Sequence, residues 1–219
     1  MYKTFQSTDT EAILHKIDDR IKEYDLSKTN EQGFLDFRKY YNNTQNPVDL
    51  YILTCFSFNY QFRFNNNLEY NNPFGRNRSQ FSCNMKNNLL AFLDKIKNSN
   101  IMFTPHDFLD FDFSNLRDGD VVYCDPPYLI TTGSYNDGNR GFKDWKEEQE
   151  IALYQLLDKL HRQNVKFAVS NVVMHKGIRN EILLDWCKKY MVTTIESSYS
   201  NSSYNTKREG SSEVLVTNY

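Results

Sequence analysis

Hydrophobic residues in the first hundred positions recur at the spacing of helices. Positions 13, 14, 17 and 21 are apolar and share one face, which predicts a helix whose amino-terminal cap is Thr8 or Thr10. Similar spacing predicts further helices at about 31–41, 47–58 and 80–97, and the helix at 47–58 is apolar on nearly all sides. We therefore expect a helical domain over residues 1–97.

The chain from residue 98 onward alternates between short apolar runs and helical spacing. Strands are predicted at 101–103, 121–124, 165–169, 192–196 and 213–217, and helices are predicted at about 146–163 and 178–190. Strands that alternate with helices are typical of an α/β fold with a mainly parallel sheet. We therefore assign residues 98–219 to an α/β domain.

The apolar run at 121–124 is followed by Asp125, Pro126, Pro127 and Tyr128. We expect the run to form a buried strand, and proline cannot continue a strand, so the acid and the ring project at its carboxyl end. Open α/β sheets bind ligands at that end. The Asp125 carboxylate and the Pro126 carbonyl can accept the two hydrogens of an exocyclic amino group, which leaves the nitrogen lone pair free to attack a methyl electrophile. Tyr128 can stack on the base, which must be flipped out of a duplex to be reached.

This motif resembles the catalytic motif of the amino-group DNA methyltransferases. Residues 125–131, followed by Tyr135 and Asn136, are most similar to the Dam-type adenine-N6 enzymes (D12 class, alpha group) of bacteria and phages. Residues 167–171 resemble the next strand of that family, and residues 72–76 resemble part of its DNA-recognition domain. The resemblance implies a methyltransferase-type, Rossmann-like sheet with an inserted helical DNA-recognition domain. It also implies catalytic roles for Asp125, Pro126, Pro127 and Tyr128.

The segment 59–78 is rich in asparagine and aromatic residues, and it predicts a short hairpin. From Arg63 to Lys97 there are six basic and two acidic residues, a local balance of +4. Composition alone favours a polar surface hairpin, whereas the resemblance implies contacts with a GATC site in double-stranded DNA. The residues implied for DNA binding are Asn59, Arg63, Asn65, Pro73, Arg76 and Tyr135. Asn77 departs from the family pattern, in which a further basic residue is expected.

The resemblance also implies S-adenosylmethionine as the methyl donor. Asp107 and Phe108 match residues that hold its adenine, and Asp125 belongs to the same implied site, although residues 107–120 also fit an ordinary acidic loop. In the family, a glycine-rich loop after the first strand binds the rest of the cofactor. None of the eight glycines here forms a paired-glycine turn after a strand. We therefore expect a sheet that lacks its first strands, so that an upstream polypeptide completes the cofactor site or the chain is a non-catalytic relative.

The net charge, the hydrophobic pattern and the spacing of cysteines and histidines give further expectations about DNA binding, location and metal sites. A formal net charge of −2 argues against DNA binding through overall charge and requires a local basic face. The sequence shows neither a transmembrane run nor a signal peptide, so we expect a cytoplasmic protein. Its cysteines and histidines lack metal-ligand spacing, so no metal site is expected.

The functional prediction is an adenine-N6 DNA methyltransferase that acts on a flipped adenine, at GATC or a related site. Tyr135 and Phe142, in a loop after the motif, are candidates for holding the extruded base. The alternative is an inactive DNA-binding or regulatory relative. A cytosine-N4 enzyme is less favoured, because the motif begins with Asp125 rather than serine.

Overall fold

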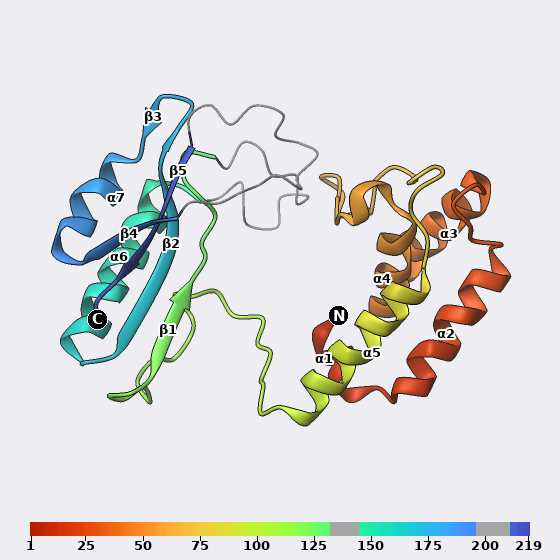
Figure 1. Ribbon diagram of the computed structural model, residues 1–219, viewed down its shortest axis with the longest axis horizontal. Coiled ribbons are helices and arrows are strands. Elements are labelled where there is room, and N and C mark those ends of the chain that lie inside the picture. Colours follow the sequence, from red (N-terminus) through yellow and green to blue (C-terminus); the bar gives the residue numbers. More distant parts are fainter. Residues whose placement is uncertain (132–144, 196–210) are drawn as a thin grey trace. The chain divides into compact units, whose positions relative to one another are not determined.

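The computed structural model describes residues 1–131, 145–195 and 211–219. These residues form two compact units, which are Met1–Pro105 and the described residues from His106 onward. Each unit has its own hydrophobic core (Figure 1). The helical part and the α/β part of the chain therefore fold around separate cores.

The first unit is built from helices. Their bounds are α1 Tyr2–Ser7, α2 Thr10–Glu23, α3 Glu31–Thr44, α4 Pro47–Phe56 and α5 Cys83–Asn98, with a short 3-10 helix η1 at Phe58–Tyr60. The four longer helices agree with the predicted ones within a few residues, whereas the apolar pattern does not predict α1. Their apolar faces meet in one core, whose fully enclosed side chains include Ile17, Phe34, Phe37, Leu53 and Leu93.

Short polar side chains decide where these helices begin. Asp9 caps α2 by accepting a hydrogen bond from the Ala12 amide at 3.1 Å, so the expectation that Thr8 or Thr10 supplies the cap is wrong. The helix expected from residue 80 begins three residues later, because Ser82 supplies its cap. Apolar spacing locates the helices, and the capping side chain sets the first residue.

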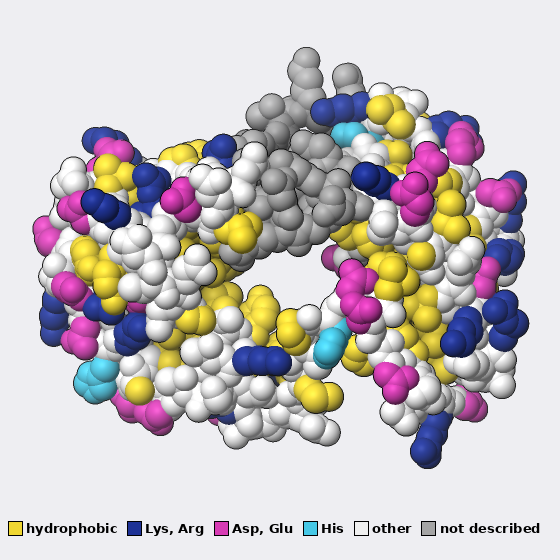
Figure 2. All heavy atoms as spheres, turned by 180° about the vertical axis from the view of Figure 1, so that it is seen from behind, with side chains coloured by type: hydrophobic (Ala, Val, Ile, Leu, Met, Phe, Trp, Pro, Cys, Tyr) yellow, Lys and Arg dark blue, Asp and Glu magenta, His cyan; other side chains and the backbone are white. Residues whose placement is uncertain are grey.

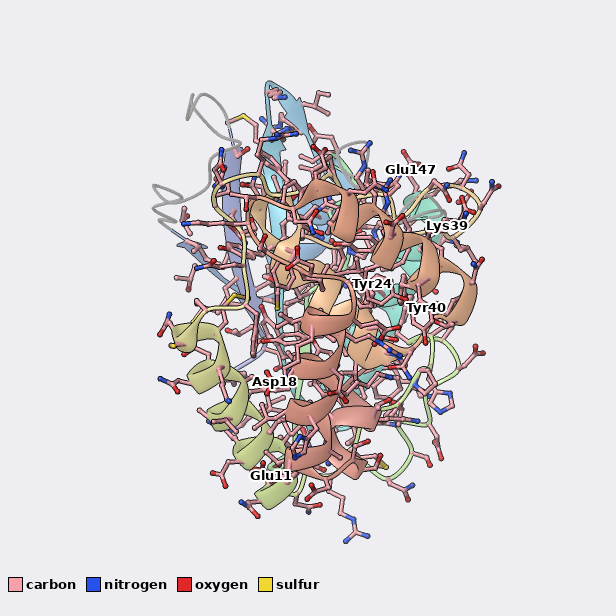
Figure 3. All side chains as sticks on the ribbon, turned by 90° about the vertical axis from the view of Figure 1, so that its right-hand side faces the viewer. Glu11, Asp18, Tyr24, Lys39, Tyr40 and Glu147 are labelled. Carbon is pink, nitrogen blue, oxygen red and sulfur yellow. The ribbon has the colours of Figure 1, made fainter. Side chains whose placement is uncertain are left out.

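A buried charge lies between α2 and α4. Asp49 in α4 is fully enclosed, and Arg20 of α2 donates to its Oδ1 atom at 3.3 Å. Arg20 also lies 4.7 Å from the centre of the Tyr40 ring of α3, and the Tyr24 ring lies 5.8 Å from that same ring (Figure 3). These contacts join three helices, and the ion pair offsets part of the desolvation cost of both charges.

The second unit contains a mixed sheet. Its strands are β1 Val121–Cys124, β2 Lys166–His175, β3 Ile178–Arg179, β4 Met191–Ile195 and β5 Ser211–Thr217, and its helices are α6 Glu147–Arg162, α7 Glu181–Trp186 and the 3-10 helix η4 Cys187–Lys189. The strand order is β1-β2-β5-β4, and β3 pairs with β2. Strand β1 runs parallel to β2, whereas the other described pairings are antiparallel. The α/β class is as expected, but the described sheet is mixed rather than mainly parallel, because β5 returns between β2 and β4.

Both α6 and α7 pack against one face of this sheet (Figure 1). Leu157 of α6, Phe167 of β2 and Trp186 of α7 are buried together there. The other face of β1 is open, because Val121 is 56% and Tyr123 is 62% exposed. Figure 2 shows hydrophobic side chains among the polar ones on one side of the molecule's surface. The expectation that 121–124 is a buried strand is therefore wrong for one of its two faces.

Two predicted elements take another form. Residues 101–103 form no strand, since no described strand pairs with them, and Met102 is 83% exposed. The helix expected at 178–190 begins only at Glu181, because Gly177 (φ +82°) turns the chain from β2 into β3 and Asn180 then caps α7. Within the described ranges, no helix is long and apolar enough to cross a membrane.

Candidate active site

The predicted catalytic motif directly follows β1, at the carboxyl end of that strand. Cys124 is paired in register with Val169 of the parallel strand β2, so the next residues, Asp125 and Ser170, are neighbours. The buried Ser170 hydroxyl donates to Oδ1 of Asp125 at 3.0 Å. Strand β2 therefore fixes the orientation of the carboxylate.

Two tyrosines extend this hydrogen-bond network. The Tyr128 hydroxyl lies 3.2 Å from Oδ1 of Asp125 and 2.9 Å from Oε1 of Glu213 in β5. The Tyr123 hydroxyl lies 3.1 Å from the Ser170 hydroxyl. Among the described residues, no group donates to Oδ2 of Asp125. This second oxygen can therefore accept a hydrogen bond from a substrate.

The surroundings of Tyr128 keep its hydroxyl protonated. Burial raises the pKa of Tyr128, and the carboxylates of Glu213 and Asp125 raise it further because they disfavour another negative charge beside them. The hydroxyl is therefore a hydrogen-bond donor at neutral pH. Burial also raises the pKa of the adjacent Cys124 thiol to about 11, so this thiol stays neutral.

A second polar network centres on Glu150 of α6, whose side chain is fully buried. Its Oε1 atom accepts hydrogen bonds from the amides of Asn171 at 2.9 Å and Asn180 at 3.0 Å, and from the Tyr154 hydroxyl at 2.5 Å. Its Oε2 atom accepts from the Trp145 indole at 2.7 Å. Because Asn171 directly follows Ser170, which donates to Asp125, this network joins α6 to the part of β2 that contacts the predicted motif.

Sequence reasoning does not single out Glu150 or Glu213. Glu150 is an acid on an apolar helix face, which it shares with Leu153 and Leu157, whereas Glu213 lies on the strand face that also carries Ser211 and Thr217. Ionised side chains are seldom buried unless they have partners. An acid at a position that periodicity assigns to the core is the signal that finds Glu150, and the local sequence offers no such signal for Glu213.

The segment implied in DNA recognition is a compact loop of the helical unit. Ser57 forms an isolated bridge to Phe74, and Phe64 forms one to Tyr70, so the predicted hairpin is reduced to single bridges. Asn72 is buried, and its amide donates to two backbone carbonyls of the opposite arm, each at 2.9 Å. At least one of the many asparagines therefore serves the loop's own structure.

The side chains implied for DNA contact differ in their surroundings. Oδ1 of Asn65 accepts from the amides of residues 67 and 69, and Nδ2 donates to Glu69, so this side chain is used within its own turn. Arg76 forms an ion pair with Glu31. Arg63 is exposed, and its guanidinium makes no hydrogen bond or ion pair with any described residue. Among the described residues, Arg63 is therefore the one of these three whose side chain has no such partner.

Pro73 and Asn59 lie on the same loop. The Pro73 carbonyl accepts a hydrogen bond from the Phe58 amide at 2.8 Å, and Asn59 has a left-handed backbone with φ of 55°. Tyr135 and Phe142 fall outside the described residues. Contacts of these two with an extruded base therefore stay predictions.

Of the three residues implied for S-adenosylmethionine binding, Phe108 alone borders the cavity described for this unit. Asp107 accepts a hydrogen bond from the backbone amide two residues later at 2.9 Å, and the Phe108 ring packs 5.7 Å from the Trp145 ring. A cavity of about 350 Å³ borders Phe108, but α6 and residues 108–114 line it. Neither Asp107 nor Asp125 is among its lining residues. The three residues implied for cofactor binding therefore do not share this cavity.

Comparison with known proteins provides close relatives. The chain is 58% identical over 216 residues to "Type II methyltransferase M.FokI" of Planomicrobium okeanokoites, and 52% identical over 221 residues to "Modification methylase StsI" of Streptococcus sanguinis. These alignments cover 99% and 100% of the chain but only 33% and 34% of the two relatives. The chain therefore spans about a third of the length of these proteins.

A more distant relative and a family model also match this chain to DNA adenine methyltransferases. A "DNA adenine methylase" of Escherichia coli (strain K12) is 25% identical over 187 residues, which cover 84% of the chain and 63% of that protein. The model of the D12 class N6 adenine-specific DNA methyltransferases matches residues 1–204. That match includes the helical unit, the motif at the end of β1 and the strand that holds it. The chain therefore belongs to the D12 class of N6 adenine-specific DNA methyltransferases.

Proposed function

We propose that this chain transfers a methyl group to the N6 amino group of adenine in double-stranded DNA. S-adenosylmethionine is the proposed donor, and when bound it supplies an electrophilic methyl group. One observation supports the proposal most directly. Oδ1 of Asp125 accepts a hydrogen bond from Ser170, while none of the described residues donates to Oδ2. The carboxylate is thus oriented before any substrate binds.

In this proposal the motif acts on the amine of the target base. Oδ2 of Asp125 accepts a hydrogen bond from one N6 hydrogen, and the Pro126 carbonyl accepts one from the other. The nitrogen lone pair is then directed away from both acceptors. The two prolines restrict the backbone that carries these acceptors, and Tyr128 stacks on the base after its extrusion from the duplex. Preoriented acceptors of this kind need no rearrangement during the reaction.

We propose that the segment 59–78 reads the target site, at GATC or a related sequence. Arg63 is available for a bidentate contact with a guanine edge. Arg76 must first give up its ion pair with Glu31. The GATC assignment is supported by the resemblance to Dam-type enzymes, and a role in restriction–modification is supported by the names of the relatives.

We also propose that a further polypeptide segment completes the cofactor site. Among the described strands, β1 has a neighbour on one edge only, and its Val121 and Tyr123 side chains are exposed. Open strand edges and apolar faces are normally covered in native proteins. A segment that pairs with β1 would cover its open edge and would add the cofactor contacts that the glycine-rich loop makes in the family.

Analysis of the methylated product tests the proposed function. The chain is incubated with a large excess of S-adenosylmethionine, which offsets weaker cofactor binding in the absence of the further segment, and with a GATC duplex or a duplex of the same composition whose site is permuted. The DNA is then digested to nucleosides and analysed by mass spectrometry. We expect N6-methyldeoxyadenosine from the GATC duplex alone. N4-methyldeoxycytidine would contradict the target base, and duplex binding without any methylated nucleoside would favour the inactive relative.

A further inference from the structure

Glu213 is an acid beside the catalytic motif that no step of the proposed reaction uses. It lies in β5, where it is paired with Val172 of β2 and with Ile195 of β4. Paired residues share a sheet face, and Val172 is two residues beyond Ser170, so Glu213 projects from the same face as Ser170. That face carries the hydrogen-bond network of Asp125 and Tyr128.

The Tyr128 hydroxyl has one hydrogen and two carboxylate acceptors. Its oxygen lies 2.9 Å from Oε1 of Glu213 and 3.2 Å from Oδ1 of Asp125. The shorter distance favours the bond to Glu213. Asp125 already accepts the Ser170 hydroxyl on the same oxygen. Without Glu213, the phenol would donate to Asp125 alone, which would weaken that carboxylate as an acceptor for a substrate amine.

We propose that Glu213 is a positioning residue, which holds the Tyr128 ring by its hydroxyl and keeps that hydroxyl from engaging Asp125 fully. This inference rests on the proposed function, in which Tyr128 stacks on the extruded adenine and Asp125 accepts its amine. Glu213 touches neither substrate nor cofactor in this account. Its effect on the reaction passes through Tyr128.

A double-mutant cycle separates this role from that of an ordinary strand residue. The variants are Glu213→Leu, which removes the acceptor at similar volume, Glu213→Gln, which keeps an acceptor, Tyr128→Phe, and the combination of Tyr128→Phe with Glu213→Leu. Each is measured by the single-turnover rate of methyl transfer to a GATC duplex and by the dissociation constant for that duplex. Glu148→Leu, at an exposed position of α6, serves as the matched control.

Loss of a charged hydrogen bond predicts that Glu213→Leu lowers the single-turnover rate by about tenfold and leaves duplex affinity unchanged. Glu213→Gln should restore most of the rate, and Glu213→Leu should have no further effect once residue 128 is phenylalanine. If the leucine variant does not fold, Glu213→Asp takes its place, because the shorter side chain cannot reach the hydroxyl.

Different results would contradict the proposed function and the proposed role of Glu213. A wild-type chain that forms no N6-methyldeoxyadenosine would contradict the proposed function, and the role of Glu213 would fall with it. An active wild-type chain whose Glu213→Leu rate is unchanged would overturn the role of Glu213 alone. The same conclusion follows if the loss is just as large in the Tyr128→Phe background, or if only duplex affinity changes.

Discussion

Replacement of Glu150 by leucine should destabilise the α/β unit strongly. The carboxylate accepts four hydrogen bonds, from Trp145, Tyr154, Asn171 and Asn180, and it is fully buried. Leucine fills a similar volume but accepts none of them. Buried donors without an acceptor lose the water that solvates them in the unfolded chain, and this loss sets the size of the effect.

The loss in the free energy of unfolding depends on which of the four donors keep another hydrogen-bond acceptor. Trp145 is half-buried and can reach water, and the Asn171 amide keeps the Tyr154 oxygen at 3.2 Å. The Tyr154 hydroxyl hydrogen and the Asn180 amide lose their acceptor. Each such group costs about 1–3 kcal/mol, and relief of the buried charge offsets part of the total, so the free energy of unfolding should fall by about 3 kcal/mol. Glu150→Gln can keep the acceptor at Oε1 and loses only the Trp145 bond, so it should cost about 1 kcal/mol.

Urea unfolding followed by tryptophan fluorescence measures this change. The chain has two tryptophans, Trp145 and Trp186, and both belong to the α/β unit. Glu148→Leu is the matched control, because Glu148 lies on the same helix and is exposed, and it should change the stability by no more than about 0.5 kcal/mol. A Glu150→Leu variant within about 1 kcal/mol of the wild type would refute the network's structural role.

Two further predictions concern the DNA loop and the motif's thiol. Arg63→Ala should weaken binding to a GATC duplex, or relax its sequence preference, by roughly 1–3 kcal/mol in fluorescence anisotropy. Arg76→Ala should cost less, because Arg76 already has Glu31 as a partner; equal losses would contradict this ranking. At pH 8 iodoacetamide should modify the exposed Cys83 well before Cys124, whose pKa of about 11 leaves about one thiol in a thousand ionised, and the Cys124 rate should rise as the pH approaches 11. Peptide mapping that finds both cysteines equally reactive at pH 8 would refute the burial of Cys124.

Most helices and strands could be predicted because they follow local rules. Apolar periodicity located α2 to α6, and the prolines after Cys124 marked the end of β1. The elements that were predicted wrongly depend either on a distant partner strand or on a single turn or cap residue. Residues 101–103 have strand-like composition but no described partner strand, and the helix expected at residue 178 was displaced by the turn at Gly177 and the cap at Asn180.

The candidate site could be predicted only in part. The motif itself is local, so sequence alone identified Asp125 and Tyr128. Their partners lie 45 and 85 residues away, at Ser170 and Glu213, and the role of Glu213 depends on the antiparallel pairing of β5 with β2. Composition favoured a polar surface hairpin at 59–78, and the resemblance implied DNA contacts there, but neither could show that the Asn65 side chain is used within its own turn.

The role of Asp125 is the central claim, and one comparison tests it most directly. Wild type and Asp125→Ala are assayed side by side for methyl transfer to a GATC duplex and for duplex affinity. We expect that Asp125→Ala forms no N6-methyldeoxyadenosine while its duplex affinity stays close to that of the wild type, because the proposed sequence-reading contacts lie in the separate segment 59–78. Methyl transfer by Asp125→Ala at the wild-type rate would contradict the account.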